Sequence, residues 1–117
     1  KEKDLVGRSR QMGTATLSRL KALQNEFDFI GNVQGKGMFF GMELVTDRKS
    51  KKPATALARS ISEKMLQRGV ILNVGGLYGQ MLKLSPPLVI TQSQIDYVLD
   101  TLHDVMAETA PSVRVTA

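Results

Sequence analysis

The sequence predicts an α+β domain in which a small antiparallel or mixed sheet of three to four strands is covered by helices. Two observations lead to this prediction. Apolar residues recur at helical spacing in three segments, and extended segments bounded by turn residues lie between them. The resulting order is helix, strand, strand, helix, strand, strand, helix. Because this order contains no long series of parallel crossovers, an all-parallel sheet is not expected.

The residues from about Asp4 to Glu26 form the first predicted helix. Small and apolar side chains recur there three, four or seven positions apart, which places them on one helical face. These residues are Val6, Gly13, Leu17, Leu20 and Leu23. The helix is therefore expected to be long and amphipathic.

A β-hairpin is predicted next. A short extended segment, 30–33, precedes the turn residues Gly35-Lys36-Gly37, and 38–45 is the clearest strand of the chain. Successive strand residues point to opposite faces of a sheet. One face is expected to contain Met38, Phe40, Met42 and Leu44, and the other Phe39, Gly41, Glu43 and Val45.

The middle of the chain is predicted to hold a second helix and two short strands. The helix follows Pro53 and stops at Gly69, in the position that glycine prefers. Its buried face is expected to contain Leu57, Ala58, Ile61 and Met65. Residues 70–74 then form an apolar strand, and the three glycines in 75–79 favour a turn. The second strand, 81–84, ends before Pro86-Pro87 because proline donates no backbone hydrogen bond.

The last helix is predicted to begin at a capping box formed by Thr91 and Gln94, with Ile90 and Ile95 packed across it. Its buried stripe is expected to contain Ile95, Val98, Leu99, Leu102, Val105 and Met106. Residues 111–117, beginning at Pro111, are expected to be a flexible tail.

Composition narrows the possible function classes. A chain of 117 residues fits one domain with one core, and its 42% hydrophobic and 23% charged residues disfavour disorder. It contains no cysteine, so disulfides and thiolate metal sites are excluded. It also lacks an apolar run of membrane-spanning length, so no membrane partner is expected. A cytoplasmic location is compatible with these features and is the expected one.

The net charge of +5 raises the question of a nucleic-acid partner. Much of the excess lies in one cluster between two elements, at Arg48, Lys49, Lys51 and Lys52, which is typical of a solvated loop. Phe39 and Phe40 are neighbours on opposite faces of a strand, so they cannot form a shared platform for stacking bases. No nucleic-acid partner is expected.

The titratable residues do not predict catalytic or metal chemistry within this chain. His103 is the one histidine, and no carboxylate-and-hydroxyl constellation that would make it a general base accompanies it in the sequence. Asp96 and Asp100 share a helical face and are interpreted as a solvated pair. The glycines of 35–41 precede a strand, whereas a phosphate-binding loop precedes a helix. No catalytic residue, cofactor ligand or metal ligand is therefore predicted.

Three linked motifs resemble the class III (omega) aminotransferase family. Residues 30–45, IGNVQGKGMFFGMELV, are similar to the family pattern I-G-D-V-R-G-K-G-L-M-x-G-I-E-L-V. Residues 68–72, RGVIL, are similar to its R-G-(apolar)-L motif. Residues 75–91, GGLYGQMLKLSPPLVIT, are similar to its G-x-x-x-N-x-(apolar)-R-(apolar)-x-P-P-L-x-I-T run. The resemblance covers nearly the whole chain and is to the C-terminal small domain.

The resemblance implies an aspartate-aminotransferase-like fold in a two-domain enzyme that is usually a homodimer. Residues 1–110 would be the small domain, with 1–26 the helix that enters it from the large domain. Pyridoxal 5'-phosphate would be bound by that large domain, which supplies the lysine that forms a Schiff base. The substrates implied are an amine or amino acid and a keto acid. The chain is therefore expected to be inactive alone.

Lys83 is the one residue for which the resemblance implies a substrate contact. Many relatives have at this position an arginine whose planar group holds the substrate carboxylate. Lysine offers a point charge instead, which suits a carboxylate held less rigidly or a phosphorylated or longer amine. Relatives that resemble amino-alcohol phosphate lyases also have lysine here, which keeps a lyase open as a second reaction class. Two further hypotheses are that Lys83 is a surface lysine on an edge strand, and that the chain is a non-catalytic ligand-binding or interaction module.

Overall fold

The computed structural model describes residues 2–36, 39–46, 49–85 and 90–116, and these form three helices and a four-stranded sheet. In chain order the elements are α1 (Glu2–Glu26), β1 (Ile30–Lys36), β2 (Phe39–Leu44), α2 (Thr55–Gln67), β3 (Asn73–Gly75), β4 (Met81–Leu84) and α3 (Gln92–Thr116). The predicted α+β class and order of elements are confirmed. The predictions for Met38, Arg48 and Pro86-Pro87, and for the side chain of Val6, lie outside the described residues.

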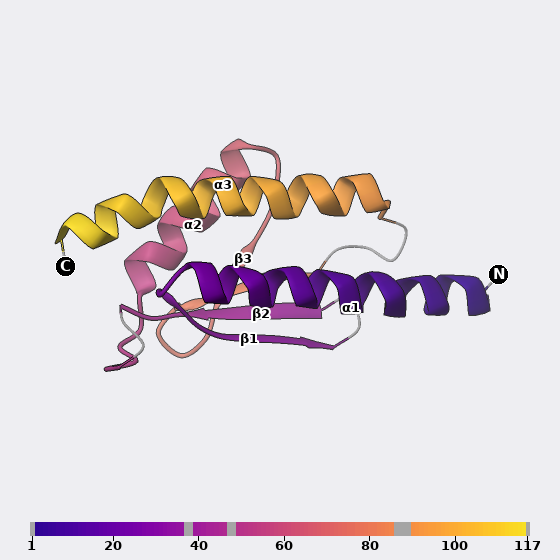
Figure 1. The fold of residues 1–117 in the computed structure, drawn as a ribbon, viewed down its shortest axis with the longest axis horizontal. Helices are drawn as coiled ribbons and strands as arrows, with labels where there is room; N and C mark the ends of the chain where they lie inside the picture. The colour runs from indigo at the N-terminus through magenta and orange to yellow at the C-terminus, as the bar shows by residue number, and fades with distance from the viewer. Residues whose placement is uncertain (1, 37–38, 47–48, 86–89, 117) are drawn as a thin grey trace.

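The sheet is antiparallel throughout, with the strand order β1-β2-β4-β3. The predicted hairpin is the β1–β2 pair, in which Val33 lies opposite Met42. The helices of the described chain lie on one side of the sheet, with α1 directly over β1 and β2 (Figure 1). The architecture is therefore a sheet with one covered face and one open face.

The strand β1 extends to Lys36, beyond the end that the glycine signal predicted. Gly35 pairs with Phe40 across the hairpin. A Cβ atom at position 35 would lie 2.8 Å from Phe40 Cδ1 and 3.0 Å from Leu17 Cδ1, so the missing side chain makes room for the buried ring of Phe40. Gly35 thus serves close packing within a strand rather than a turn.

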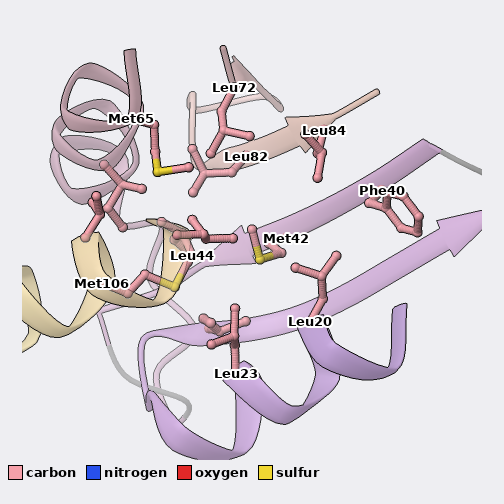
Figure 2. Packing of buried hydrophobic residues seen from close by; sticks show 14 of the residues in the cluster. Leu20, Leu23, Phe40, Met42, Leu44, Met65, Leu72, Leu82, Leu84 and Met106 are labelled. Atoms are coloured by element: carbon pink, nitrogen blue, oxygen red, sulfur yellow. The ribbon is translucent and has the colours of Figure 1, made fainter. Parts of the chain in front are cut away.

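The core lies between the covered face of the sheet and the helices. Strand alternation sorts the residues as predicted, because Phe40, Met42 and Leu44 are buried in β2 and Leu82 and Leu84 are buried in β4. Figure 2 shows these side chains together with side chains that the helices contribute to the same cluster. The helical contributors labelled there are Leu20 and Leu23 from α1, Met65 from α2 and Met106 from α3.

The segment 70–74 is not the predicted strand. Only its last two residues belong to β3, although Val70 and Leu72 are buried. The reason is that the backbone of 70–72 is bonded to α2. The N–H of Val70 donates to the carbonyl of Met65 at 2.9 Å, and the carbonyl of Leu72 accepts from Ser62 Oγ at 2.9 Å. Gly69, with φ +84°, allows the chain to turn back in this way after α2, as predicted.

The capping box at the start of α3 is confirmed. The N–H of Gln94 donates to Thr91 Oγ1 at 3.2 Å, and the N–H of Thr91 donates to Gln94 Oε1 at 2.9 Å. The predicted stripe also lies in or against the core. Two N–H groups at the helix start are thereby satisfied, which fixes where α3 begins.

The helix α3 continues through Pro111 to Thr116, into the segment expected to be a flexible tail. A proline inside a helix removes one hydrogen bond and crowds the preceding turn, which kinks or ends many helices. Here the helical backbone continues past it. The flexibility expected for 111–117 and the domain limits 1–110 stay predictions.

Shortening Leu44 to alanine is expected to lower the free energy of unfolding by about 3 kcal/mol, because Leu44 is fully buried at the centre of the core. Urea denaturation of the chain would measure the change. Ile71→Ala removes a comparable aliphatic group from a side chain that is 71% exposed, and its effect should stay within about 0.5 kcal/mol. Similar losses for both variants would contradict the assignment of the core.

Candidate functional site

Lys83 lies in β4, on the open face of the sheet. Its strand neighbours Leu82 and Leu84 are buried on the covered face, and alternation places Lys83 opposite to them. Gly41 of β2 and Asn73 of β3 are its cross-strand partners. The strand β4 is therefore an interior strand, so the placement of Lys83 on an edge strand is wrong. Sequence could not show this, because strand order depends on pairing between distant segments. Whether Lys83 is a substrate contact or only a surface lysine stays a prediction.

The side chain of Lys83 is half-buried and extends toward β3. A Cβ atom at Gly75 would lie 2.7 Å from Lys83 Cε and 2.8 Å from Nζ, so the end of the side chain lies over that glycine. Among the described residues, no carboxylate lies within ion-pair distance of the ammonium group. The open face thus presents the positive charge of Lys83, whose direction is set by the backbone beneath it. Lys36 of β1 lines the same hollow.

The loop 75–80 begins beside this ammonium group and is held by hydrogen bonds at several points. Gly76 and Gly79 have φ values of +87° and +68°, which side chains rarely adopt. The N–H of Tyr78 donates to Gln80 Oε1 at 3.0 Å, and the hydroxyl of Thr55 donates to the carbonyl of Tyr78. The predicted turn is confirmed.

Gln80 is the residue that connects this loop to the sheet. Its side chain is buried, and its Nε2 donates to Glu43 Oε2 at 3.5 Å while its Oε1 accepts from Tyr78. Held in this way, the loop exposes Leu77 (85%) and Tyr78 (60%) to solvent. Neither Gln80 nor Thr55 was predicted as part of a site. A glutamine directly after a glycine turn and before an apolar strand is the only signal in the sequence that could have indicated Gln80.

The described residues do not fit pyridoxal phosphate by themselves. Of the lysines whose side chains are described, only Lys64 and Lys83 are partly buried. Lys64 Nζ lies 3.4 Å from Thr109 Oγ1, between α2 and α3 and on the covered side of the sheet. Lys83 ends over a backbone glycine on an open face. Neither lysine lies in an enclosed pocket that could exclude water from a cofactor.

His103 has a carboxylate partner that its sequence surroundings did not predict. Its Nε2 lies 2.6 Å from Oε2 of Glu26, at the end of α1, 77 positions away. Both side chains are about half exposed, so the pair contributes little to stability and links two helix surfaces. His103 is a surface residue of α3, on the side of the sheet that the helices cover and not on the open face.

Asp96 and Asp100 both bind Arg19 of α1. Arg19 Nη1 lies 3.1 Å from Asp96 Oδ1, and Nη2 lies 2.8 Å from Asp100 Oδ1. The two aspartates are therefore ion-pair partners of another helix and not an isolated solvated pair. In the part of the chain that the structure describes, no group of three His, Asp or Glu side chains is arranged to hold a metal ion.

The same fold occurs in solved structures of transaminases and related enzymes. A phospholyase from Arthrobacter, in complex with phosphoethanolamine, superimposes with a TM-score of 0.85 and 32% identity, over 91% of this chain and 25% of that one. An aminotransferase from Bacillus anthracis gives a TM-score of 0.83 and 33% identity, over 92% and 25%. The chain thus has a fold that occurs within enzymes of the aminotransferase type and corresponds to about a quarter of their length.

Residues 1–106 match the family described as class-III aminotransferase, and the chain belongs to that family. This family depends on pyridoxal phosphate. The relatives include alanine–glyoxylate aminotransferase 2 homolog 2, mitochondrial, of Arabidopsis thaliana, at 34% identity over 92% of this chain and 22% of the relative. A leucine/methionine racemase of Thermococcus litoralis is 36% identical over 92% and 24%. The chain spans about a quarter of the length of these relatives.

Replacing Gln80 with leucine is expected to loosen the loop 75–80, because the N–H of Tyr78 would lose its acceptor. The free energy of unfolding should fall by about 1 to 3 kcal/mol, and the Tyr78 amide should exchange faster with deuterium. Gln67→Leu makes the same chemical change at an exposed position of α2 and should alter neither quantity. Unchanged exchange at Tyr78 in Gln80→Leu would show that the side chain does not hold the loop.

Proposed function

We propose that this chain is the C-terminal part of a pyridoxal-phosphate-dependent transaminase that moves an amino group between an amine or amino acid and a keto acid. The observation that supports this most is the placement of Lys83. Its ammonium group lies on the open face of an interior strand, beside a hydrogen-bonded loop, and at the position where the family pattern has a substrate-binding arginine. Membership of the class III family supports the reaction class.

The role proposed for Lys83 is to bind the carboxylate of the substrate. Among the described residues the ammonium group has no carboxylate partner, so its charge is available to an incoming anion. A lysine makes a point contact rather than the two parallel hydrogen bonds of an arginine, which fixes a carboxylate less strictly. Tyr78 and Leu77, on the loop beside it, would form the wall that excludes water from this end of the substrate.

The open face of the sheet would form one wall of a cleft, and the missing part of the protein would form the other. Pyridoxal phosphate, bound by that missing part, supplies the electron-withdrawing group on which amino transfer depends. The residues of this chain bind and orient the substrate and exclude water. The chain alone is accordingly proposed to be inactive.

A lyase acting on a phosphorylated amine is the second candidate function. One observation favours it, namely the likeness to a phospholyase whose structure contains phosphoethanolamine. Lysine is also a common phosphate ligand as a point charge. The two candidates differ in product, because only the lyase releases inorganic phosphate from such a substrate.

We further propose that the full-length protein is a cytoplasmic homodimer with no nucleic-acid or membrane partner. None of the helices within the described ranges has the length and apolar character needed to cross a membrane. Some relatives are named as mitochondrial, so location has to be measured in cells with a tagged full-length protein. Sedimentation of the holoenzyme would give the number of subunits.

The full-length protein is expected to bind added pyridoxal phosphate and to develop the visible absorbance of the cofactor joined to a lysine. This chain alone should not, because its described residues offer no enclosed lysine. Spectra of both proteins after removal of unbound cofactor would test this. A full-length protein without the absorbance would support the non-catalytic module instead.

Replacing Lys83 with alanine in the full-length enzyme is expected to raise the KM for the keto acid by about 10- to 100-fold, the effect of losing one charged hydrogen bond. Lys83→Arg should keep or lower that KM, because the guanidinium group matches a carboxylate better. Lys21→Ala removes an exposed lysine of α1 and serves as the control. Equal kinetics for all of these variants would show that Lys83 does not contact substrate.

A further inference from the structure

We propose that Gly75 is a positioning residue that fixes the ammonium group of Lys83 by having no side chain. This inference rests on the proposed function, because it gives Gly75 a role only if Lys83 binds substrate. Gly75 would be a determinant of substrate specificity, because it decides where the positive charge of Lys83 lies.

The nearest contacts around Gly75 point to Lys83. The three atoms nearest to a Cβ at this position all belong to Lys83, with Cε at 2.7 Å, Nζ at 2.8 Å and Cδ at 3.3 Å. Real Cβ atoms essentially never approach another atom within 3.0 Å. Any side chain at position 75 would therefore occupy the place where the end of Lys83 now lies.

The backbone does not require glycine at this position. Gly75 is the last residue of β3 and pairs with Met81 in a regular antiparallel register, outside the left-handed region of φ. Its neighbour Gly76 differs, because its φ of +87° would be strained for any other residue. The need for glycine at position 75 comes from the side chain that crosses it.

The space left by the missing side chain of Gly75 affects where the ammonium group of Lys83 lies. A lysine side chain has many rotamers, and holding it in one of them costs conformational entropy. Over Gly75 the stem can lie flat against the backbone of β3, which directs the ammonium group to the base of the loop 75–80. A methyl group at position 75 would displace the charge from that place without removing it.

The displaced atoms are the far end of a flexible side chain, so the fold should tolerate the change. Gly75→Ala is expected to keep the melting temperature of the full-length protein within about 3 °C of the original. The substrate should respond more strongly, because misplacing a binding group by about 1 Å can lower efficiency by up to about 10²-fold. The effect should be confined to substrates with the anionic group that Lys83 binds.

The test is steady-state kinetics of the full-length holoenzyme with Gly75→Ala, Lys83→Ala and the double variant. Gly75→Ala is expected to raise the KM for a keto acid about tenfold while kcat changes less than about twofold, which is the pattern of lost substrate binding. An amine donor without a carboxylate should keep its KM. In the Lys83→Ala background the glycine change should have no further effect, because the side chain it acts through is absent.

Gly7→Ala is the matched control. It adds a methyl group to an exposed position of α1, away from the open face, where no described atom lies within 4 Å. Its KM should stay close to the original. A KM for Gly75→Ala that is unchanged, or that rises equally with and without Lys83, would overturn the positioning role. Unchanged kinetics in Lys83→Ala would instead overturn the substrate contact itself.

Discussion

Burial of only one face of the sheet is the constraint on which the rest of the structure depends. Leu82 and Leu84 must be covered by helices, and the two-residue period of a strand then forces Lys83 onto the uncovered side. A shift of one residue in the register of β4 would expose the two leucines and bury the lysine among apolar groups. The free energy of burying the core therefore also decides on which face the positive charge lies.

The loop beside that charge is held by a second, local constraint. Gly76 and Gly79 provide the left-handed backbone, and the buried amide of Gln80 bonds both to the loop at Tyr78 and to the sheet at Glu43. Because a buried amide without partners is costly, these bonds keep Gln80 and the loop in one arrangement. The exposed side chains of Leu77 and Tyr78 are thus attached to a rigid base, as a substrate-facing wall requires.

What the sequence predicted well is whatever depends on short-range spacing. The alternation in β2, the apolar stripe of α3 and the box of Thr91 with Gln94 follow from residues a few positions apart. The errors arise where the structure of a segment depends on a partner that is distant in the sequence. Val70 is bonded to α2 instead of a strand, and the interior place of β4 depends on pairing with β2 and β3. For the same reason the resemblance suggested Lys83 as a candidate, but not the crossing of its side chain over β3.

Two adjacent glycines illustrate how stability and binding can be separated along one segment. At Gly76 a side chain would strain the backbone and collide with Gln80, so a change there disturbs the fold. At Gly75 the atoms that it would meet first belong to the movable end of Lys83. Gly75 can therefore be replaced more easily than Gly76. A replacement at Gly75 moves the ammonium group of Lys83 and leaves the backbone in place. Within one fold, that position offers a route to altered substrate preference at little cost in stability.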